Sequence, residues 1–161
     1  MSQTGVVLEF RGEYYFLSNY YTAPFNWRGE YFLSGEQAFA YAKAQFATKD
    51  SDRYQREILA TLEPGQAKKI GRRLPLDVVQ WDQHKVSFMR QIVHAKFRTA
   101  DPILVHKLLN TNAKMLIEGN DWGDKFWGRV QENGRWVGLN TLGVILMEER
   151  GWWNRGDEGR P

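Results

Sequence analysis

Hydrophobic and polar positions change their spacing twice along the chain, and these changes divide it into three zones. From residue 5 to about 34, short apolar runs such as Val6–Phe10 and Tyr14–Tyr21 are interrupted by Gly and Pro. In the same zone, two aromatic segments flank Arg28 and Gly29. The pattern predicts short strands and turns, with a hairpin over residues 25–33.

From about residue 35 to 111, apolar residues return every three or four positions, which is the spacing of amphipathic helices. Pro64 opens one short helix and Gly71 closes it. Asp101 and Pro102 supply an N-cap and a first-turn proline for the last helix of this zone. The predicted helices cover residues 36–46, 54–62, 64–70, 82–97 and about 101–110.

In the third zone, residues 114–118 predict a short strand and residues 120–125 a polar loop. Asn133-Gly134, between residues 126–131 and 135–138, is typical of a type I′ hairpin. Residues 139–149 predict an amphipathic helix that ends at Gly151. The zones together predict an α+β fold: a compact single domain over residues 1–153, mainly helical with small antiparallel sheets, and a loosely held polar tail over residues 154–161.

Composition narrows the class of protein. With 161 residues, 42% of them hydrophobic and 25% charged, the chain is long and apolar enough for one folded domain, which excludes a disordered protein. No apolar stretch approaches the roughly 20 residues of a membrane span. The first residues also lack the pattern of a secretory signal. We therefore expect a cytoplasmic protein with no membrane partner.

Charge and aromatic content each leave two interpretations open. The net charge of +3 reflects either a solvated excess of Lys and Arg or a face that binds anions such as nucleic acid. Aromatic residues make up 14% of the chain, which supplies either a bulky core or stacking platforms for planar ligands.

Missing motifs exclude several kinds of catalytic site. The chain has no Cys, which removes thiolate zinc sites and Cys nucleophiles. His84, His94 and His106 form no His-Glu-x-x-His motif, and neither a Gly-x-Ser-x-Gly elbow nor a phosphate-binding loop is present. We expect neither a metal nor a cofactor.

Polar residues within apolar elements are the candidates that remain. Glu36 and Lys43 are seven residues apart, two helical turns, so they share one face of the helix predicted over residues 36–46. They form either a structural ion pair or a catalytic couple with shifted pKa values.

Two further segments each allow a functional and a structural interpretation. Asp124 lies among Trp and Gly residues, a composition that suits a sugar or base site, or equally a turn capped by a carboxylate. Arg72 and Arg73 follow Gly71 and either bind a phosphate or form the solvated last turn of a helix.

Several short motifs, in their order and spacing, resemble the NADAR (YbiA-like) family over nearly the whole chain. The motifs are Phe16-Leu17-Ser18-Asn19-Tyr20-Tyr21, Pro24-Phe25, Ser34-Gly35-Glu36-Gln37-Ala38-Phe39, Lys43-Ala44, Ala67-Lys68-Lys69-Ile70-Gly71-Arg72, Trp81, Lys96-Phe97, Leu108-Leu109-Asn110-Thr111, Leu116-Ile117-Glu118, Gly123-Asp124-Lys125-Phe126-Trp127-Gly128, Gly138-Leu139-Asn140-Thr141-Leu142-Gly143 and Leu146-Met147.

The resemblance implies an N-glycosidase, which cleaves a bond between ribose and nitrogen. Some members act on phosphorylated early intermediates of riboflavin biosynthesis, and others remove ADP-ribose from guanine bases of nucleic acid. The family's active-site positions fall on Glu36, Lys43, Trp81 and Asp124. Lys43 matches the lysine associated with Schiff-base formation on the opened ribose. Leu139 departs from the polar residue that many members carry there, so the substrate preference can differ.

The chemistry of these residues is compatible with that reaction. Cleavage passes through an oxocarbenium-like state, which Glu36 or Asp124 can stabilise or serve by activating water. Lys43 must be neutral for part of the cycle, so burial has to lower its pKa. For substrate binding we expect Phe39, Trp81 or Trp127 to stack on the base, with Arg11 and Arg72 as the candidates that bind phosphates. The other expected substrate-binding residues are Gly12, Ser18, Asn19, Tyr20, Gly71, Glu118, Gly128 and Asn140.

The function expected from the sequence is removal of ADP-ribose from modified guanine in nucleic acid. One alternative keeps the pocket and changes the substrate to a phosphorylated riboflavin intermediate. The other is a non-catalytic module that binds ADP-ribose or nucleic acid through its aromatic residues.

Overall fold

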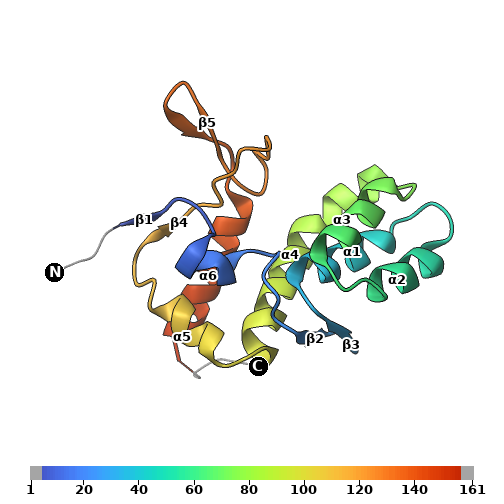
Figure 1. Cartoon of the computed structure of the whole chain (residues 1–161), viewed down its shortest axis with the longest axis horizontal. Helices are drawn as coiled ribbons and strands as arrows, with labels where there is room; N and C mark the ends of the chain where they lie inside the picture. Colours follow the sequence, from blue (N-terminus) through green and yellow to red (C-terminus); the bar gives the residue numbers. More distant parts are fainter. Residues whose placement is uncertain (1–4, 157–161) are drawn as a thin grey trace. The chain divides into compact units, whose positions relative to one another are not determined.

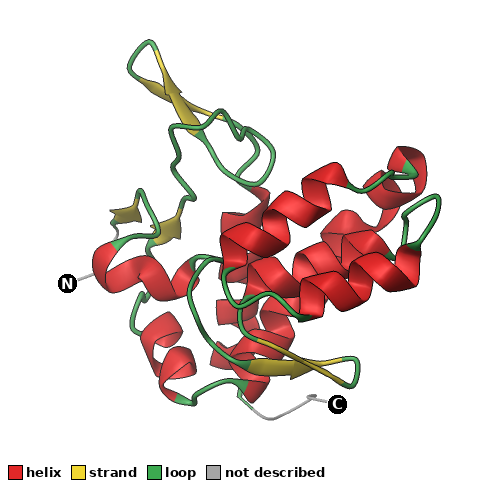
Figure 2. Cartoon of the chain, turned by 45° about the vertical axis from the view of Figure 1, so that its right-hand side comes forward, coloured by secondary structure: helices red, strands yellow, loops and turns green. Residues whose placement is uncertain are grey.

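The computed structural model describes residues 5–156 of the chain, which divides into two compact units. The inserted unit is Asn19–Asp101, and the terminal unit combines Met1–Ser18 with Pro102–Pro161. Helices predominate in the described part of both units, and each sheet has two strands (Figure 1, Figure 2). The predicted α+β class, mainly helical with small sheets, is confirmed.

The inserted unit begins with a hairpin and continues as helices. In the hairpin, β2 (Phe25–Trp27) pairs antiparallel with β3 (Glu30–Phe32). The turn residues Arg28 and Gly29 both have positive φ, 53° and 79°, which matches the twist of a two-residue hairpin turn. The helices are α1 (Gly35–Ala44), α2 (Ser51–Leu59), α3 (Pro64–Arg73) and α4 (Val78–Thr99).

Helix α1 packs against α2, α3 and α4. Its inward positions are small, and Ala40 and Ala44 join Ile58, Ala67 and Leu74 in one buried cluster. Small side chains let neighbouring helices approach closely, which keeps the polar residues of α1 near the residues of α3 and α4.

A buried amide fixes α1 against the end of α2. The Gln37 side chain accepts a hydrogen bond from Leu33 N–H at 2.8 Å. It donates to the carbonyls of Ile58 and Thr61 at 3.0 and 3.1 Å. Because Gln37 directly follows Glu36, these bonds also set the rotation of the α1 face that carries Glu36.

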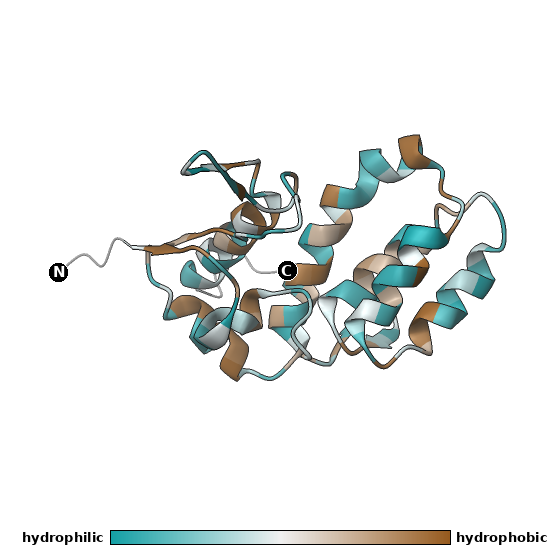
Figure 3. Ribbon diagram, turned by 45° about the horizontal axis from the view of Figure 1, so that its top comes forward, coloured by the Kyte–Doolittle hydropathy of each residue, from teal (hydrophilic) through white to brown (hydrophobic). Residues whose placement is uncertain are grey.

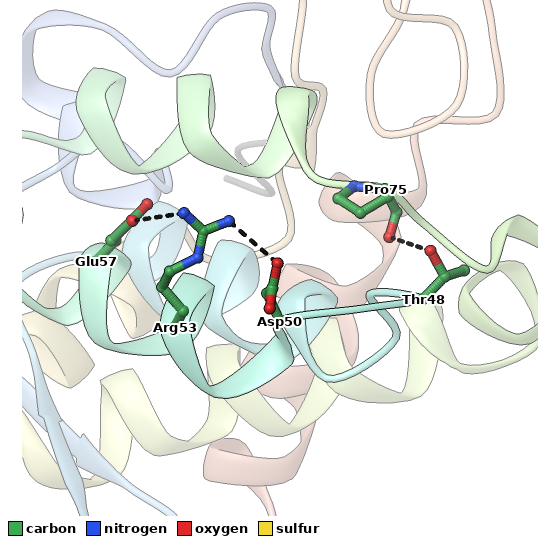
Figure 4. Close-up of polar contacts among 5 residues, drawn as sticks. All are labelled: Thr48, Asp50, Arg53, Glu57 and Pro75. Carbon is green, nitrogen blue, oxygen red and sulfur yellow. Dashed lines mark hydrogen bonds and ion pairs between the residues drawn. The ribbon is translucent and has the colours of Figure 1, made fainter.

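Two backbone hydrogen bonds join the loop that follows α1 to the loop that precedes α4. Asp77 N–H donates to the Phe46 carbonyl at 2.8 Å, and Thr48 N–H donates to the Pro75 carbonyl at 2.8 Å. The Thr48 hydroxyl points at the same carbonyl (Figure 4). Asp77 also caps α4 through a 3.2 Å bond from Gln80 N–H, so Phe46 and the first turn of α4 are held together.

In the terminal unit, the N-terminal segment pairs with the C-terminal segment through two short parallel strands. Val6 and Val7 lie opposite Met115 and Leu116. The hairpin around Asn133 has the expected two positive φ values. The elements are β1 (Val6–Val7), the 3-10 helix η1 (Gly12–Leu17), α5 (Ile103–Leu109), β4 (Met115–Leu116), β5 (Val130–Glu132), β6 (Arg135–Val137) and α6 (Thr141–Asn154).

Two glycines predicted to end helices lie inside them. Gly71 is within α3, where an added Cβ would lie 3.5 Å from the Ala40 Cβ, so it packs against α1 and the helix ends only before Pro75. Gly151 is within α6, and Gly156 with φ 73° follows the end of that helix instead.

Three other predictions need correction. Residues 12–17 form η1 rather than strands and turns, because Phe16 and Leu17 are both buried, which an alternating strand would not allow. Helix α4 begins at Val78, four residues before the predicted start, since Asp77 is its cap, and its first turn carries two exposed valines. Hydrophobic (brown) and hydrophilic (teal) positions alternate along the helices (Figure 3). One of the small sheets, β1 with β4, is parallel.

The predicted polar tail is described only in part. Asn154 is the last residue of α6, and residues 157–161 lie outside the described part. The domain bounds of 1–153 stay a prediction. Over residues 5–156, none of the helices combines the length and the apolar composition that crossing a membrane requires.

Candidate active site

The first candidate group lies on one face of α1, at its start. Ser34 caps the helix, since its hydroxyl accepts Gln37 N–H at 3.1 Å. Glu36 N–H donates to the Asn19 carbonyl at 2.9 Å. The buried Asn19 side chain donates to Met89 Sδ at 3.4 Å. Asn19, expected to bind substrate, therefore holds the backbone of Glu36 in place.

Lys43 lies two turns further along α1, partly buried. Burial lowers the pKa of Lys43, because the low-dielectric surroundings disfavour its charged form. The Glu36 charge opposes this by raising the pKa, while Arg72 and Lys85 lower it further. Glu36 and Lys43 thus interact electrostatically within a cluster that holds two additional cations.

Aromatic rings cover this face of α1. Phe39, one turn from Lys43, lies 5.0 Å from the Trp81 ring centroid. Trp81 is buried and also contacts Phe46 at 5.7 Å and Phe88 at 6.1 Å. The Trp81 ring is packed among these three rings and is itself buried. Phe39, like Phe46, is only partly buried, so it has exposed ring surface for a planar ligand.

Helix α3 brings its last turn beside Lys43. A Cβ added to Gly71 would lie 4.0 Å from Lys43 Cδ, and the exposed Arg72 follows directly. Arg72 therefore lies in the last turn of a helix, which was one of the two interpretations of its sequence position. Its charge lowers the pKa of Lys43. Tyr20 lies on the same helix's flank, with Lys68 Nζ 5.4 Å from its ring centroid.

In the terminal unit, Asp124 organises a tight loop. One oxygen of its carboxylate, Oδ1, accepts the N–H groups of Phe126 and Trp127 at 3.0 and 2.9 Å. The Asn120 side chain closes the loop, accepting Asp124 N–H at 2.9 Å and donating to its carbonyl at 2.8 Å. The carboxylate has the turn-capping role that the sequence allowed.

Asn140 and Gly128 complete this loop region. Asn140 accepts Glu118 N–H at 2.9 Å and donates to the Leu116 carbonyl at 2.8 Å. Gly128 lets the chain pass so close to Glu118 that an added Cβ would lie 2.1 Å from the Glu118 carbonyl oxygen. Both residues therefore set the backbone that carries Glu118.

The remaining expected residues of the terminal unit lie around η1 and beside Asp124. Arg11 is exposed at the beginning of η1, Gly12 follows with φ 58°, and Ser18 ends the helix. Trp127 makes an edge contact with Phe126 at 4.8 Å and is partly buried.

The structure thus sorts the expected site residues into two sets. The inserted unit gathers Glu36, Phe39, Lys43, Gly71, Arg72 and Trp81 around α1, with Asn19 and Tyr20 on their flanks. The terminal unit holds Asp124 and Trp127 in one loop, with Glu118, Gly128 and Asn140 supporting it, and Arg11, Gly12 and Ser18 at η1. Within residues 5–156, no three acidic or histidine side chains cluster in a way that suits a metal ion.

Sequence reasoning missed Lys85 and the two amides Gln37 and Asn120. Lys85 lies one helical turn after Trp81, so the spacing on α4 placed both on one face. Gln37 lies at a buried position of α1 and Asn120 at a buried position of a Gly-containing loop, and a buried amide indicates a structural hydrogen-bond hub.

Comparison with known proteins identifies the family of the chain and a similar solved structure. The class is that of the N-glycosidase-type hydrolases implied by the NADAR domain: the family model for that domain matches residues 9–152, and the chain belongs to the NADAR family. Among solved structures, the chain is similar to the E. coli protein YbiA, determined by NMR. The two share 27% sequence identity at a TM-score of 0.78, over 99% of this chain and 91% of that one. No curated protein matches the chain.

Proposed function

We propose that the protein removes ADP-ribose from modified guanine bases of nucleic acid by cleaving the ribosyl–nitrogen bond. The observation that carries the proposal is the environment of Lys43. Its pKa is lowered by burial, and it interacts with the Glu36 carboxylate on the same helix face. A lower pKa increases the fraction of the amine that is neutral, and the neutral amine is the form that attacks carbon.

In the proposed reaction, neutral Lys43 Nζ adds to the anomeric carbon of the opened ribose. The carbon–nitrogen bond to guanine breaks, and the base nitrogen leaves with a proton that the Glu36 carboxylate has taken from the attacking amine. The resulting Schiff base takes up one water, which releases ADP-ribose and returns the free amine. The net change is addition of one water across the glycosidic bond.

Other residues serve this scheme through binding. Phe39 provides exposed ring surface for the base, with Trp81 as its backing, and Arg72 binds a phosphate by charge-assisted hydrogen bonds. Asp124 is the other carboxylate among the expected catalytic residues, and it lies in the terminal unit. One of its oxygens is committed to backbone N–H groups, which fixes its direction.

A cationic helix favours nucleic acid over a small riboflavin intermediate. Helix α3 carries Lys68, Lys69, Arg72 and Arg73 and no acidic residue. Such a run of cations strengthens binding to a polymer of phosphates more than binding to a single phosphate group.

The test incubates the protein with an oligonucleotide that carries ADP-ribosylated guanine and follows free ADP-ribose by mass spectrometry. Lys43→Ala should release none, whereas Lys49→Ala, an exposed lysine just beyond α1, should match the wild type. Cyanoborohydride should trap a covalent adduct on the peptide that contains Lys43. Release by Lys43→Ala at the wild-type rate would refute the nucleophile. If the protein cleaves a phosphorylated riboflavin intermediate and not the ADP-ribosylated oligonucleotide, the proposed substrate is wrong and the riboflavin intermediate takes its place.

A further inference from the structure

Two lysines lie in corresponding positions on the facing surfaces of α1 and α4. On the α1 side, Lys43 lies between Phe39 and Phe46, four residues after one and three before the other. On α4, Lys85 lies between Trp81 and Phe88 with the same spacing. Residues so spaced share one face of a helix.

Ring contacts show that these two faces pack on each other. Trp81 lies 5.0 Å from Phe39 and 5.7 Å from Phe46, and Phe46 lies 5.9 Å from Phe88. The rings before and after each lysine are therefore in contact across the interface. Lys43 and Lys85 lie among these rings, and the Arg28 guanidinium also reaches them, with its Cζ 4.9 Å from the Phe88 ring centroid.

An ion pair holds Lys85 at this interface. Its Nζ lies 2.9 Å from Asp82 Oδ1, one turn earlier on α4, and its side chain is 22% exposed, against 52% for Asp82. The ammonium is thus on the more buried side of the pair and the carboxylate on the solvent side.

We propose that Lys85 is a positioning residue for Lys43: its ammonium, paired with Asp82 at the aromatic α1–α4 interface, disfavours a second positive charge there and makes the Lys43 amine easier to deprotonate for attack. This inference rests on the proposed function and names how its nucleophile is activated. A desolvated lysine beside another cation is an established route to a reactive amine.

The other charged groups around Lys43 act in known directions. Glu36, on α1, favours the charged amine, and Arg72, on α3, disfavours it together with Lys85. Of the two cations, Arg72 lowers the pKa of Lys43 more and Lys85 lowers it less. His84, beside Lys85 on α4, stacks on Phe46 with the ring centroids 5.3 Å apart.

The test measures the reactivity of each lysine directly, without any substrate. Trace acetic anhydride acetylates only neutral amines, and peptide mass spectrometry across pH 6–11 gives the titration of Lys43, with exposed Lys49 as the internal reference. We compare Lys85→Met and Lys85→Gln, which remove the charge, with Lys85→Arg, which keeps it. His84→Asn controls for the neighbouring imidazole.

We expect Lys85→Met and Lys85→Gln to lower the acetylation of Lys43 at pH 8 on the order of three- to tenfold, because loss of a nearby like charge raises its pKa. Lys85→Arg should retain the wild-type titration, and Lys49 should not change in any variant. The pH dependence of ADP-ribose release should shift to higher pH in the two neutral variants only.

Two results separate this inference from the proposed function. If the wild type releases ADP-ribose but Lys43 titrates identically in the neutral Lys85 variants, the inference is overturned and the function stands. If Lys43 shifts as expected but no substrate is cleaved, the electrostatic coupling holds and the proposed function is overturned. A neutral variant that fails to fold is identified by circular dichroism, and the second neutral variant then gives the answer.

Discussion

Asn140 joins Glu118 to the beginning of α6 across 22 residues of sequence. Its Oδ1 accepts Glu118 N–H at 2.9 Å, while its Nδ2 donates to the Leu116 carbonyl at 2.8 Å. Asn140 itself is almost fully buried and has a φ of 55°, a left-handed conformation that asparagine tolerates better than most residues. One side chain thus satisfies two backbone groups, at the residue that directly precedes α6.

Asn140→Gly should therefore destabilise the protein by about 2 kcal/mol, because the backbone angle is retained but two buried groups lose their partner. Asn140→Asp should have a smaller effect, since it keeps the acceptor for Glu118 N–H and loses only the donor. Urea unfolding measures both. Since Asn140 is also an expected substrate-binding residue, an increase in KM without any change in stability would show that it contacts the substrate instead.

Gly128→Ala should destabilise the protein by about 3 kcal/mol, because its Cβ would lie 2.1 Å from the Glu118 carbonyl oxygen, and backbone must move. Gly65→Ala is the matched control. Gly65 lies in the first turn of α3 with nothing within 4 Å of an added Cβ, so this change should stabilise by about 0.5–1 kcal/mol. Thermal unfolding compares the two, and equal effects would contradict the close approach at Gly128.

Lys96, on α4, predicts a pH-dependent stability. It is fully buried between the rings of Tyr21 and Phe97, and burial lowers its pKa from 10.5 to about 7. Between these values the unfolded chain holds a proton that the folded chain lacks. The contribution of Lys96 to stability therefore increases with pH over that range, by at most about 1.4 kcal/mol per pH unit, and is lowest at pH 7 and below.

Lys96→Met should accordingly be more stable than the wild type at pH 6.5, and the difference should shrink as the pH approaches 10. Guanidinium unfolding at several pH values measures this, with Lys49→Met as an exposed control. A difference that stays constant with pH would show that Lys96 does not titrate in the folded protein.

Lys69, exposed on α3, tests whether that helix binds phosphates. Lys69→Gln should weaken oligonucleotide binding and reduce the slope of log affinity against log salt by about 0.7–0.9. Arg53→Gln is the control with the same charge change, because Arg53 on α2 is flanked by Asp50 at 3.4 Å and Glu57 at 3.8 Å (Figure 4). Identical slopes for Lys69→Gln and the wild type would exclude α3 from the interface.

Features of the fold that depend only on residues adjacent in the sequence were predictable. The turn at Asn133-Gly134 needs two positive φ values, which that dipeptide adopts readily, and the structure has 51° and 76° there. The ends of α3 and α6 were not predictable in this way. Whether Gly71 stops a helix depends on Ala40, which packs against it from another helix.

The same distinction applies to the candidate site. Helical spacing predicted that Glu36 and Lys43 share a face, and their electrostatic interaction agrees with that. The contribution of Lys85 depends on how α1 packs on α4, which no local pattern specifies. For Asp124, the composition of the loop suggested both a cap and a ligand site, and only the positions of the Phe126 and Trp127 N–H groups show that the cap is present.

The parallel pairing of β1 with β4 also imposes an order on biosynthesis. Val6 leaves the ribosome about a hundred residues before its partner Met115, which at roughly 5–20 residues per second is a delay of roughly 5–20 s. All of the inserted unit is synthesised within that interval, so it can fold while Val6 and Val7 have no strand to pair with. Nascent-chain folding should therefore proceed from the middle of the sequence outward, and the early apolar strand is the segment that a ribosome-bound chaperone would protect.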